Sequence, residues 1–240
     1  MLIRQGATRN LLLRGLNEAA IAGIAQHMER VTLEEGAYLL GAGAMIDAVW
    51  FPEQVVTSCV DSADGNSRLE VGVMGFEGMA GWPMLLGCET SPHDVVVQGG
   101  GGTALRAPRE AFLELCGSCP AAAGVFLAYV NTLMVQLGRT AVSNLRDPVE
   151  RRLARWLLMH HDRLEGDEIE LTRKAIAARL GVRRAGVTDG LHALEGRDAI
   201  RNRRGHIVIR DRTALRRIAG ESYGHAEAQY SRAIAPFGKA

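Results

Sequence analysis

The side chains whose types and spacing best fit a chemical task lie between Thr172 and Leu191. Apolar residues recur at helical spacing on both sides of Gly181, and threonine is a residue type that caps helix N-termini. Glycine permits the backbone conformation of a tight turn between two helices. We therefore predict a helix-turn-helix, a motif that places its second helix in the major groove of DNA. An αα-hairpin with a solvated basic face is the alternative.

Two kinds of DNA contact are predicted for the polar residues of this region. The second helix presents four side chains toward base edges from its outward, N-terminal face: Arg183, Arg184, Thr188 and Asp189. Residues 199–209 are predicted to form two short strands around an arginine-rich turn, a wing that contacts phosphates. The predicted phosphate contacts are Thr172, Arg173, Lys174, Arg201, Arg203 and Arg204.

The charge distribution supports a polyanion as the partner of this region. The whole chain of 240 residues has 28 basic and 27 acidic residues, a net charge of +1. Residues 146–217 contain 18 of the basic and 11 of the acidic residues, which leaves 10 basic and 16 acidic residues elsewhere. A segment with a net charge of +7 is thus attached to a body with a net charge of −6. This asymmetry predicts a nucleic-acid-binding module joined to a different domain.

The preceding part of the chain is predicted to be an antiparallel β-roll behind an N-terminal helix. Residues 11–28 have apolar positions at helical spacing. Short apolar stretches between glycine-rich turns then predict strands, and Asp64-Gly65-Asn66 is the clearest hairpin turn. The predicted strands are residues 38–40, 48–51, 54–60, 69–73 and 95–97.

A long helix is predicted between Pro120 and Pro148. Four of its apolar residues follow 4-3-4 spacing: Phe126, Val130, Leu133 and Leu137. Such a helix is either a core helix that lies on the roll or the seam of a dimer, and the 3.5-residue repeat favours the dimer interface. Asp147 and Pro148 predict the N-cap and first residue of a new helix that continues to about Leu164.

These parts together predict an α+β chain in three segments. Residues 1–119 are the N-terminal helix and roll, of the cupin-like or cyclic-nucleotide-binding-like kind, and residues 120–146 are the long dimerisation helix. Residues 147–240 are a winged helix-turn-helix domain with a C-terminal tail. This order resembles the Crp/Fnr (cyclic-AMP receptor protein) superfamily of bacterial transcription regulators. The resemblance implies that the long helix is the dimer interface and that residues 181–184 open the recognition helix, with Arg184 reading a base.

The chain departs from the resemblance at several functional positions. Ala185 stands where many relatives have glutamate, and Asp189 where some have a second arginine, so we expect a different target sequence. The family's nucleotide-binding members have a Gly-Glu loop followed by an Arg-Ser pair. Here those elements are residues 78–81, Gly-Met-Ala-Gly, and residues 91–94, Ser-Pro-His-Asp. Because Asp94 would repel a cyclic phosphate, we predict no binding of cyclic AMP.

No cofactor is predicted. The iron–sulfur members of the family hold their cluster through N-terminal cysteines, and residues 1–58 contain none. The pair Cys116 and Cys119 has C-x-x-C spacing, for which a structural role is favoured over metal binding or a redox switch. Neighbouring side chains on a helix diverge, so His160 and His161 make a poor metal pair. A haem ligand among the scattered histidines is an open alternative that no pattern favours.

Two other classes of function compete with a specific regulator. Residues 95–104 resemble a strand followed by the glycine-rich fingerprint of an NAD(P)-binding oxidoreductase, with the loop at Gly99 to Ala104. That fingerprint needs a helix directly after the loop, which Pro108 would interrupt, so we expect no enzyme. A structural protein that binds DNA without sequence preference is the second alternative.

The expected partners are double-stranded DNA, a second copy of the chain, RNA polymerase and an unidentified small-molecule effector. No window approaches the roughly 20 apolar residues of a membrane span, and the first residues make a poor signal peptide. Four cysteines do not form a disulfide framework, which fits a reducing compartment. We therefore expect a cytoplasmic protein without a membrane partner.

Overall fold

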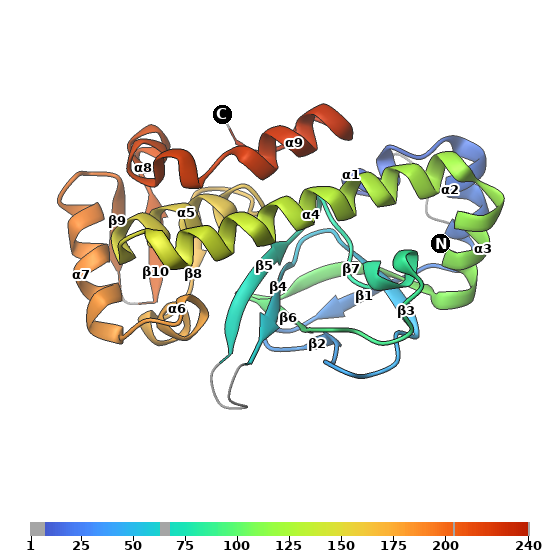
Figure 1. Ribbon diagram of the computed structural model, residues 1–240, viewed down its shortest axis with the longest axis horizontal. Coiled ribbons are helices and arrows are strands. Elements are labelled where there is room, and N and C mark those ends of the chain that lie inside the picture. Colours follow the sequence, from blue (N-terminus) through green and yellow to red (C-terminus); the bar gives the residue numbers. More distant parts are fainter. Residues whose placement is uncertain (1–7, 63–67, 204, 240) are drawn as a thin grey trace.

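A long helix, α4 (Pro120–Arg146), runs along the molecule and joins its two halves (Figure 1). The structure is a computed structural model that describes residues 8–62, 68–203 and 205–239. The β-roll lies against one part of α4, and the domain that contains the helix-turn-helix lies at its C-terminal end. This mixture of antiparallel sheets, long helix and C-terminal helix-turn-helix confirms the predicted fold class. The two prolines that bound the helix in the sequence also set its ends, since Pro120 is its first residue.

The roll consists of two antiparallel sheets. One has the order β1-β7-β3 and the other β2-β6-β4-β5. Every predicted strand is present, and the β4–β5 pair forms the predicted hairpin, although its turn at residues 64–66 lies outside the described residues. The strands are β1 (Glu29–Leu33), β2 (Tyr38–Leu40), β3 (Ala48–Pro52), β4 (Val56–Asp61), β5 (Leu69–Met74), β6 (Asp94–Gln98) and β7 (Gly102–Pro108).

Two strands of the roll, β1 and β7, are absent from the sequence prediction. They pair with each other in register, Glu29 opposite Arg106 and Leu33 opposite Gly102. Strand β1 has two charged residues, and β7 begins with glycine and ends with proline, so neither shows a continuous apolar stretch. The loop at Gly99 to Gly101 joins β6 to β7, a strand and not a helix, which removes the geometry of a dinucleotide site.

The predicted N-terminal helix is wrong in its continuity. The structure has two short helices, α1 (Leu11–Arg14) and α2 (Glu18–Ala25), because two asparagines each start a new helix. The Asn10 side chain accepts hydrogen bonds from the backbone N–H groups of Leu12 and Leu13, and Asn17 accepts one from Ala20. Two further elements precede α4: the 3₁₀ helix η2 (Trp82–Leu86) and α3 (Arg109–Ser118).

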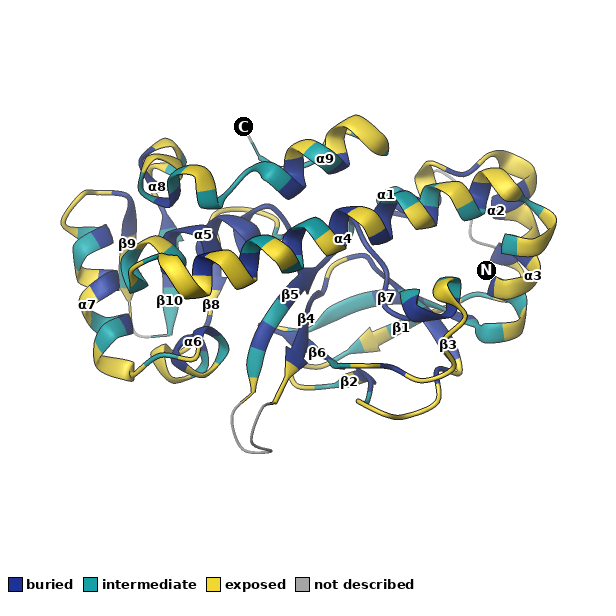
Figure 2. Cartoon of the chain, in the orientation of Figure 1, coloured by how far each residue is buried: buried dark blue, intermediate teal, exposed yellow. Residues whose placement is uncertain are grey.

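Helix α4 has a buried apolar stripe and, one residue further along the sequence and so about 100° around the helix, a stripe of exposed residues (Figure 2). Three of the four predicted dimer residues, Phe126, Val130 and Leu133, are buried within the chain itself, and Leu137 packs against the same core. Their assignment to a dimer interface is therefore corrected, because these side chains are already covered by the protomer's own residues. The helix is also long and apolar enough to span a membrane by length and composition, contrary to the sequence prediction, but this buried face is that of a core helix.

The second half of the chain begins with α5 (Val149–His161). The predicted start of this helix is one residue early, because Pro148 occupies the N-cap and the Asp147 carboxylate instead accepts hydrogen bonds from the hydroxyls of Ser143 and Ser222. Its predicted end at Leu164 is three residues late. The remaining elements are β8 (Glu168–Glu170), α6 (Arg173–Leu180), α7 (Arg184–Glu195), β9 (Ile200–Arg203), β10 (His206–Ile209), α8 (Arg212–Ala219), η3 (Gly220–Ser222) and α9 (His225–Ala233).

The C-terminal helix α9 returns to the first half of the molecule and lies along α4 (Figure 1). Tyr230 is buried in the core of the roll, and its hydroxyl donates a 2.8 Å hydrogen bond to the carbonyl oxygen of Glu77. Phe237 packs edge-on against Phe76 of the roll. The tail that the sequence groups with the helix-turn-helix thus packs on the roll.

Candidate DNA-binding interface

The helix-turn-helix consists of α6, a turn at Gly181 and α7. Thr172 caps α6, since its Oγ1 accepts a 3.1 Å hydrogen bond from the backbone N–H of Ala175. Gly181 has a φ of +63°, in the left-handed region that residues with a side chain rarely adopt. Apolar side chains from both helices form one buried cluster: Ile176, Leu180, Val187, Leu191 and Leu194. Cap, turn and apolar faces are as predicted.

Gly190 allows α7 to pack closely on α5. A Cβ at this position would lie 3.2 Å from the Leu153 side chain, which is tighter than an ordinary contact, whereas a Cβ at Gly186 would lie at an ordinary 3.8 Å from Val149. Arg152 of α5 donates a hydrogen bond to the carbonyl oxygen of Leu180 at the end of α6. These contacts fix the second helix from behind and leave its other face free.

The four residues predicted to read bases lie at the N-terminal part of α7, and three of them are exposed: Arg183, Arg184 and Asp189. Thr188 is half-buried, and its hydroxyl donates a 3.0 Å hydrogen bond to the carbonyl oxygen of Arg184, so its proton is already used within the helix. Among the residues that the structure describes, neither Arg183 nor Arg184 forms an ion pair. Their guanidinium groups therefore remain available to an external acceptor.

The wing is the hairpin of β9 and β10, with His206 opposite Arg203 and Ile209 opposite Ile200. Arg201 and Arg203 are exposed on it, as are Arg173 and Lys174 at the start of α6, whereas Arg204 lies outside the described residues. The Glu195 carboxylate accepts a 2.9 Å hydrogen bond from the backbone N–H of Asn202, which ties the wing to the end of α7. The third strand of this sheet, β8, escapes sequence prediction because it has only one apolar residue.

Two arginines of this half, Arg155 and Arg163, are buried. Arg163 is buried and contacts the buried Glu77 carboxylate of the roll, with 2.8 Å between the nearest nitrogen and oxygen atoms. Arg155 donates 2.8 Å and 3.1 Å hydrogen bonds to the Ser222 carbonyl oxygen and the Thr140 hydroxyl. Burial lowers the pKa of Arg155 and raises the pKa of Glu77. The local charge of +7 therefore includes cations that serve domain packing.

A second buried carboxylate of the roll, Glu70, accepts a hydrogen bond from a side chain of α5. Trp156 donates a 2.7 Å hydrogen bond to it from the indole nitrogen, and the Ser58 hydroxyl donates another. The Trp156 ring stacks on the His160 ring with 3.8 Å between centroids. Burial raises the pKa of Glu70 and lowers the pKa of His160 to about 3. The imidazole is thus neutral across the physiological pH range.

Two of the four cysteines, Cys59 and Cys116, lie in environments that disfavour the reactive thiolate. Cys116 and Cys119 stand at the junction of α3 and α4 as free thiols, and burial raises the pKa of Cys116 to about 11. Burial likewise raises the pKa of Cys59 to about 12. Thiols with raised pKa values are poor nucleophiles and poor metal ligands near neutral pH. Within the described ranges, no group of three or more His, Cys, Asp or Glu side chains could hold a metal ion.

Comparisons with known proteins agree with this geometry. Residues 151–218 match the Crp-like helix-turn-helix domain family. FixK2 of Bradyrhizobium japonicum is similar in structure, with 16% sequence identity, a TM-score of 0.68, and coverage of 80% of this chain and 98% of that one. A structure from Eubacterium rectale described as a regulator of the Crp/Fnr family has 16% identity, a TM-score of 0.66, and coverage of 88% and 98%. The sequence has no match among curated proteins.

A third similar structure is the c-di-GMP-responsive global regulator CLP of Xanthomonas campestris, with 15% identity, a TM-score of 0.64, and coverage of 80% of this chain and 99% of that one. At these identities the solved structures establish the fold, and the domain match establishes the type of helix-turn-helix. The resemblance to Crp/Fnr regulators is confirmed at both levels: the chain has their fold and a Crp-like helix-turn-helix domain.

Proposed function

We propose that this chain is a sequence-specific transcription regulator of the Crp/Fnr type that binds DNA in the cytoplasm as a homodimer, without a cyclic nucleotide. The observation that supports it most directly is the pair of exposed arginines at the start of the second helix of a Crp-like helix-turn-helix, Arg183 and Arg184, which form no ion pair with the part of the chain that the structure describes. In a major groove this end of the helix meets base edges, and arginine forms paired hydrogen bonds with guanine. RNA polymerase and an effector stay predicted partners.

The proposed dimer uses the outer stripe of α4. Exposed residues recur there at alternating intervals of three and four, the heptad spacing of a two-helix seam. Several of them are apolar or small: Gly124, Leu127, Met134, Gly138, Ala141 and Leu145. Leu127, Met134 and Leu145 have relative exposures of 45%, 61% and 87%. Glycine and alanine let two helices approach closely, and Asn131 in the same stripe is a polar residue of the kind that fixes the register of paired helices.

Sedimentation of two matched variants tests this dimer. Met134→Glu changes the exposed stripe, so we expect a folded protein that sediments as a monomer. Leu133→Glu, one residue away, places a charge in the roll core and should unfold the protein instead. If Met134→Glu remains a dimer at micromolar concentration, the outer stripe is not the interface.

Independence from cyclic nucleotides is supported by the chemistry of the roll. Residues 69–105 contain neither lysine nor arginine, so this part of the chain has no permanent cation for a phosphate. The Asp94 carboxylate forms a hydrogen bond within the roll, because it accepts a 2.8 Å hydrogen bond from the backbone N–H of Ala42. The Tyr129 ring of α4 lies directly against Gly78, so it fills the space beside the loop that corresponds to the Gly-Glu loop of the nucleotide-binding members.

A footprint series at increasing salt concentration tests the DNA-binding proposal. A specific regulator should protect a two-fold symmetric site whose half-sites lie about one helical turn apart. Binding with a steep salt dependence and no discrete site would instead favour the structural DNA-binding protein. Added cyclic AMP or cyclic GMP should change neither the footprint nor the affinity, and micromolar binding of either nucleotide would contradict this part of the proposal.

A further inference from the structure

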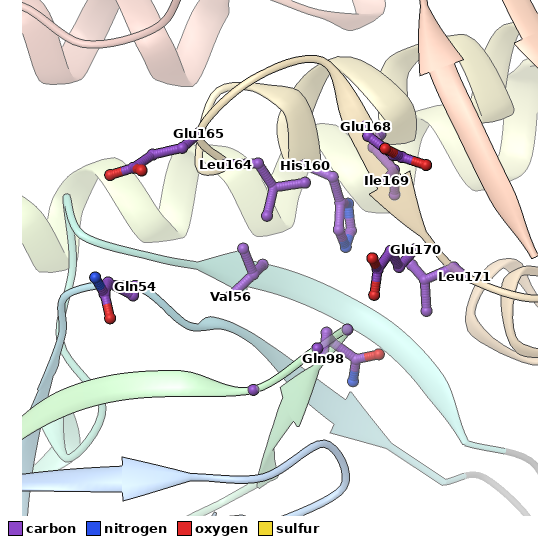
Figure 3. A pocket seen from close by; sticks show the side chains of 13 residues that line it. Gln54, Val56, Gln98, His160, Leu164, Glu165, Glu168, Ile169, Glu170 and Leu171 are labelled. Atoms are coloured by element: carbon purple, nitrogen blue, oxygen red, sulfur yellow. The ribbon is translucent and has the colours of Figure 1, made fainter.

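A cleft of about 430 Å³ lies between the roll and the DNA-binding half (Figure 3). The roll contributes Val56, Gln98 and the loop at 99–101, and the other wall contains His160 and part of the segment 164–171. Its volume is in the range of small-molecule sites, about 300–1,000 Å³. Because each half supplies one wall, an occupant would contact both.

The charged residues that line this cleft are acidic. Three glutamates line it, and none of its lining residues is lysine or arginine. Glu165 pairs with Arg9, and Glu168 lies 2.9 Å from the His206 ring. Glu170 forms no ion pair with any residue that the structure describes. Glu170 is thus the lining carboxylate left to pair with a bound cation, although Arg163 and Arg179 lie near enough behind the wall to contribute to the lowered pKa of His160.

A buried nitrogen without a partner faces the cleft. His160 is 1% exposed, and its Nδ1 donates a 3.1 Å hydrogen bond to the Trp156 carbonyl oxygen, so the neutral ring has a bare lone pair on Nε2. No described residue bonds to this Nε2, and the closest approach of Glu70 is 3.9 Å, too far for a hydrogen bond. Figure 3 shows the ring directed into the space between Val56, Gln98 and Glu170.

Gln98 has a second buried nitrogen without a hydrogen-bond partner. It is 6% exposed, lines the same cleft, and its side-chain nitrogen has no hydrogen-bond partner among the described residues. Buried polar atoms without partners are rare in folded proteins because each one costs about 1–3 kcal/mol. Of the two, the bare Nε2 of His160 is an acceptor and points to a ligand that donates a hydrogen bond, whereas the Gln98 nitrogen is a donor and takes no part in holding such a ligand.

We propose that this cleft binds a primary ammonium group on a short aliphatic chain. The ammonium group has three donors, which suits the Glu170 carboxylate and the bare Nε2 of His160 together. The aliphatic chain contacts the apolar part of the lining, Val56, Leu164 and Ile169. A divalent metal fits less well, because the described residues offer no group of three metal-ligating side chains. This site goes beyond the proposed DNA binding and does not depend on it.

Calorimetric titration of the full chain with three probes of the same four-carbon length tests the proposal. The probes are 1,4-diaminobutane, 1,4-butanediol and succinate, which differ in charge. We expect binding of the diamine alone. Glu170→Gln should weaken it by about tenfold, the effect of one charge-assisted hydrogen bond. Glu110→Gln, which removes the same charge from the exposed surface of α3, is the matched control and should leave the affinity unchanged.

Three results would overturn the proposal: no binding of the diamine up to millimolar concentration, equal binding of diamine and diol, or equal losses in the two glutamate variants. His160→Leu supplies an independent readout. Removal of an orphan acceptor that serves only the ligand should weaken diamine binding while the melting temperature stays equal or rises. A lower melting temperature with unchanged affinity would show that the imidazole is a packing group only. Since the titration contains no DNA, its outcome is independent of the regulator proposal.

Discussion

The DNA-binding half uses arginine in opposite ways on its two sides. On the outer side, Arg183, Arg184 and Arg203 are exposed without ion-pair partners among the described residues. On the inner side, Arg155 and Arg163 are buried, and Arg163 meets a carboxylate of the roll. The outer arginines fit a partner that is not part of the chain, whereas the inner ones position the domain. Net charge cannot distinguish the two sets, although only one of them can contact DNA.

The largest expected effect concerns the inner side. Arg163→Ala leaves Glu77 buried without its cation, so we expect the free energy of unfolding to fall by about 3–5 kcal/mol. Urea denaturation measures this change. Arg151→Ala is the control, since Arg151 is exposed, its contact with Asp147 is a long 3.5 Å, and Asp147 keeps the Ser143 and Ser222 hydroxyls as partners, so we expect a loss of less than about 1 kcal/mol. Equal losses in both variants would remove the distinction between inner and outer arginines.

On the outer side, the largest effect should come from Arg184→Ala. Loss of a side chain that contacts a base edge should relax the preference at one base-pair position and cost on the order of 1–3 kcal/mol for the preferred sequence. Competition binding with single-base variants of the footprinted site measures it. A uniform loss for all sequences would show that Arg184 contacts phosphate instead.

A smaller effect is expected on the pH dependence of the free energy of unfolding, through the buried His160 on the inner side. The folded-state pKa of His160 is about 3, below the ordinary 6.5, so between these pH values the unfolded chain binds a proton that the folded chain excludes. The stability contribution of neutral His160 is complete above pH 6.5 and decreases as the pH falls. Lowering the pH from 7 to 5.5 should therefore reduce the contribution of His160 to the free energy of unfolding by about 1 kcal/mol.

Urea denaturation of His160→Leu at these two pH values isolates this contribution. The variant should lose about 1 kcal/mol less than the wild type on acidification, because Glu70, whose raised pKa acts in the opposite direction, is present in both proteins. His192→Leu changes an exposed histidine and should keep the wild-type pH dependence. An identical response of all three proteins would contradict the buried neutral imidazole.

The smallest effect should come from the wing. Arg203→Ala removes one predicted phosphate contact, so all DNA sequences should bind less tightly by a similar, few-fold factor. The slope of log affinity against log salt concentration should decrease in magnitude by about 1. A change in sequence preference would contradict the division between wing and recognition helix.

Local signals predicted much of this molecule. Thr172, Gly181 and the apolar faces around them define the helix-turn-helix through capping and turn chemistry that acts within a few residues. The two prolines predicted the span of α4, because proline fits the first position of a helix and disfavours helical conformation just before it. The break between α1 and α2 was missed because periodicity does not register a capping asparagine.

Contacts between distant segments explain the other errors. Arg163 and Glu77 are 86 residues apart, and no spacing rule connects them. Two neighbouring stripes of α4 have heptad spacing, and the sequence alone does not distinguish the stripe with Phe126 and Leu133, which the protomer itself buries, from the stripe that stays exposed. Which stripe is covered depends on where the roll packs, and that information lies outside the helix.

The return of α9 to the roll has a mechanical consequence. The DNA-binding half is attached to the rest of the chain at one end through α4 and at the other through Tyr230, which is buried in the roll core. Between these two attachments the halves also meet at the buried Arg163–Glu77 and Trp156–Glu70 contacts. A recognition helix that reorients relative to the roll must therefore break or slide these polar contacts while both ends of its domain stay attached.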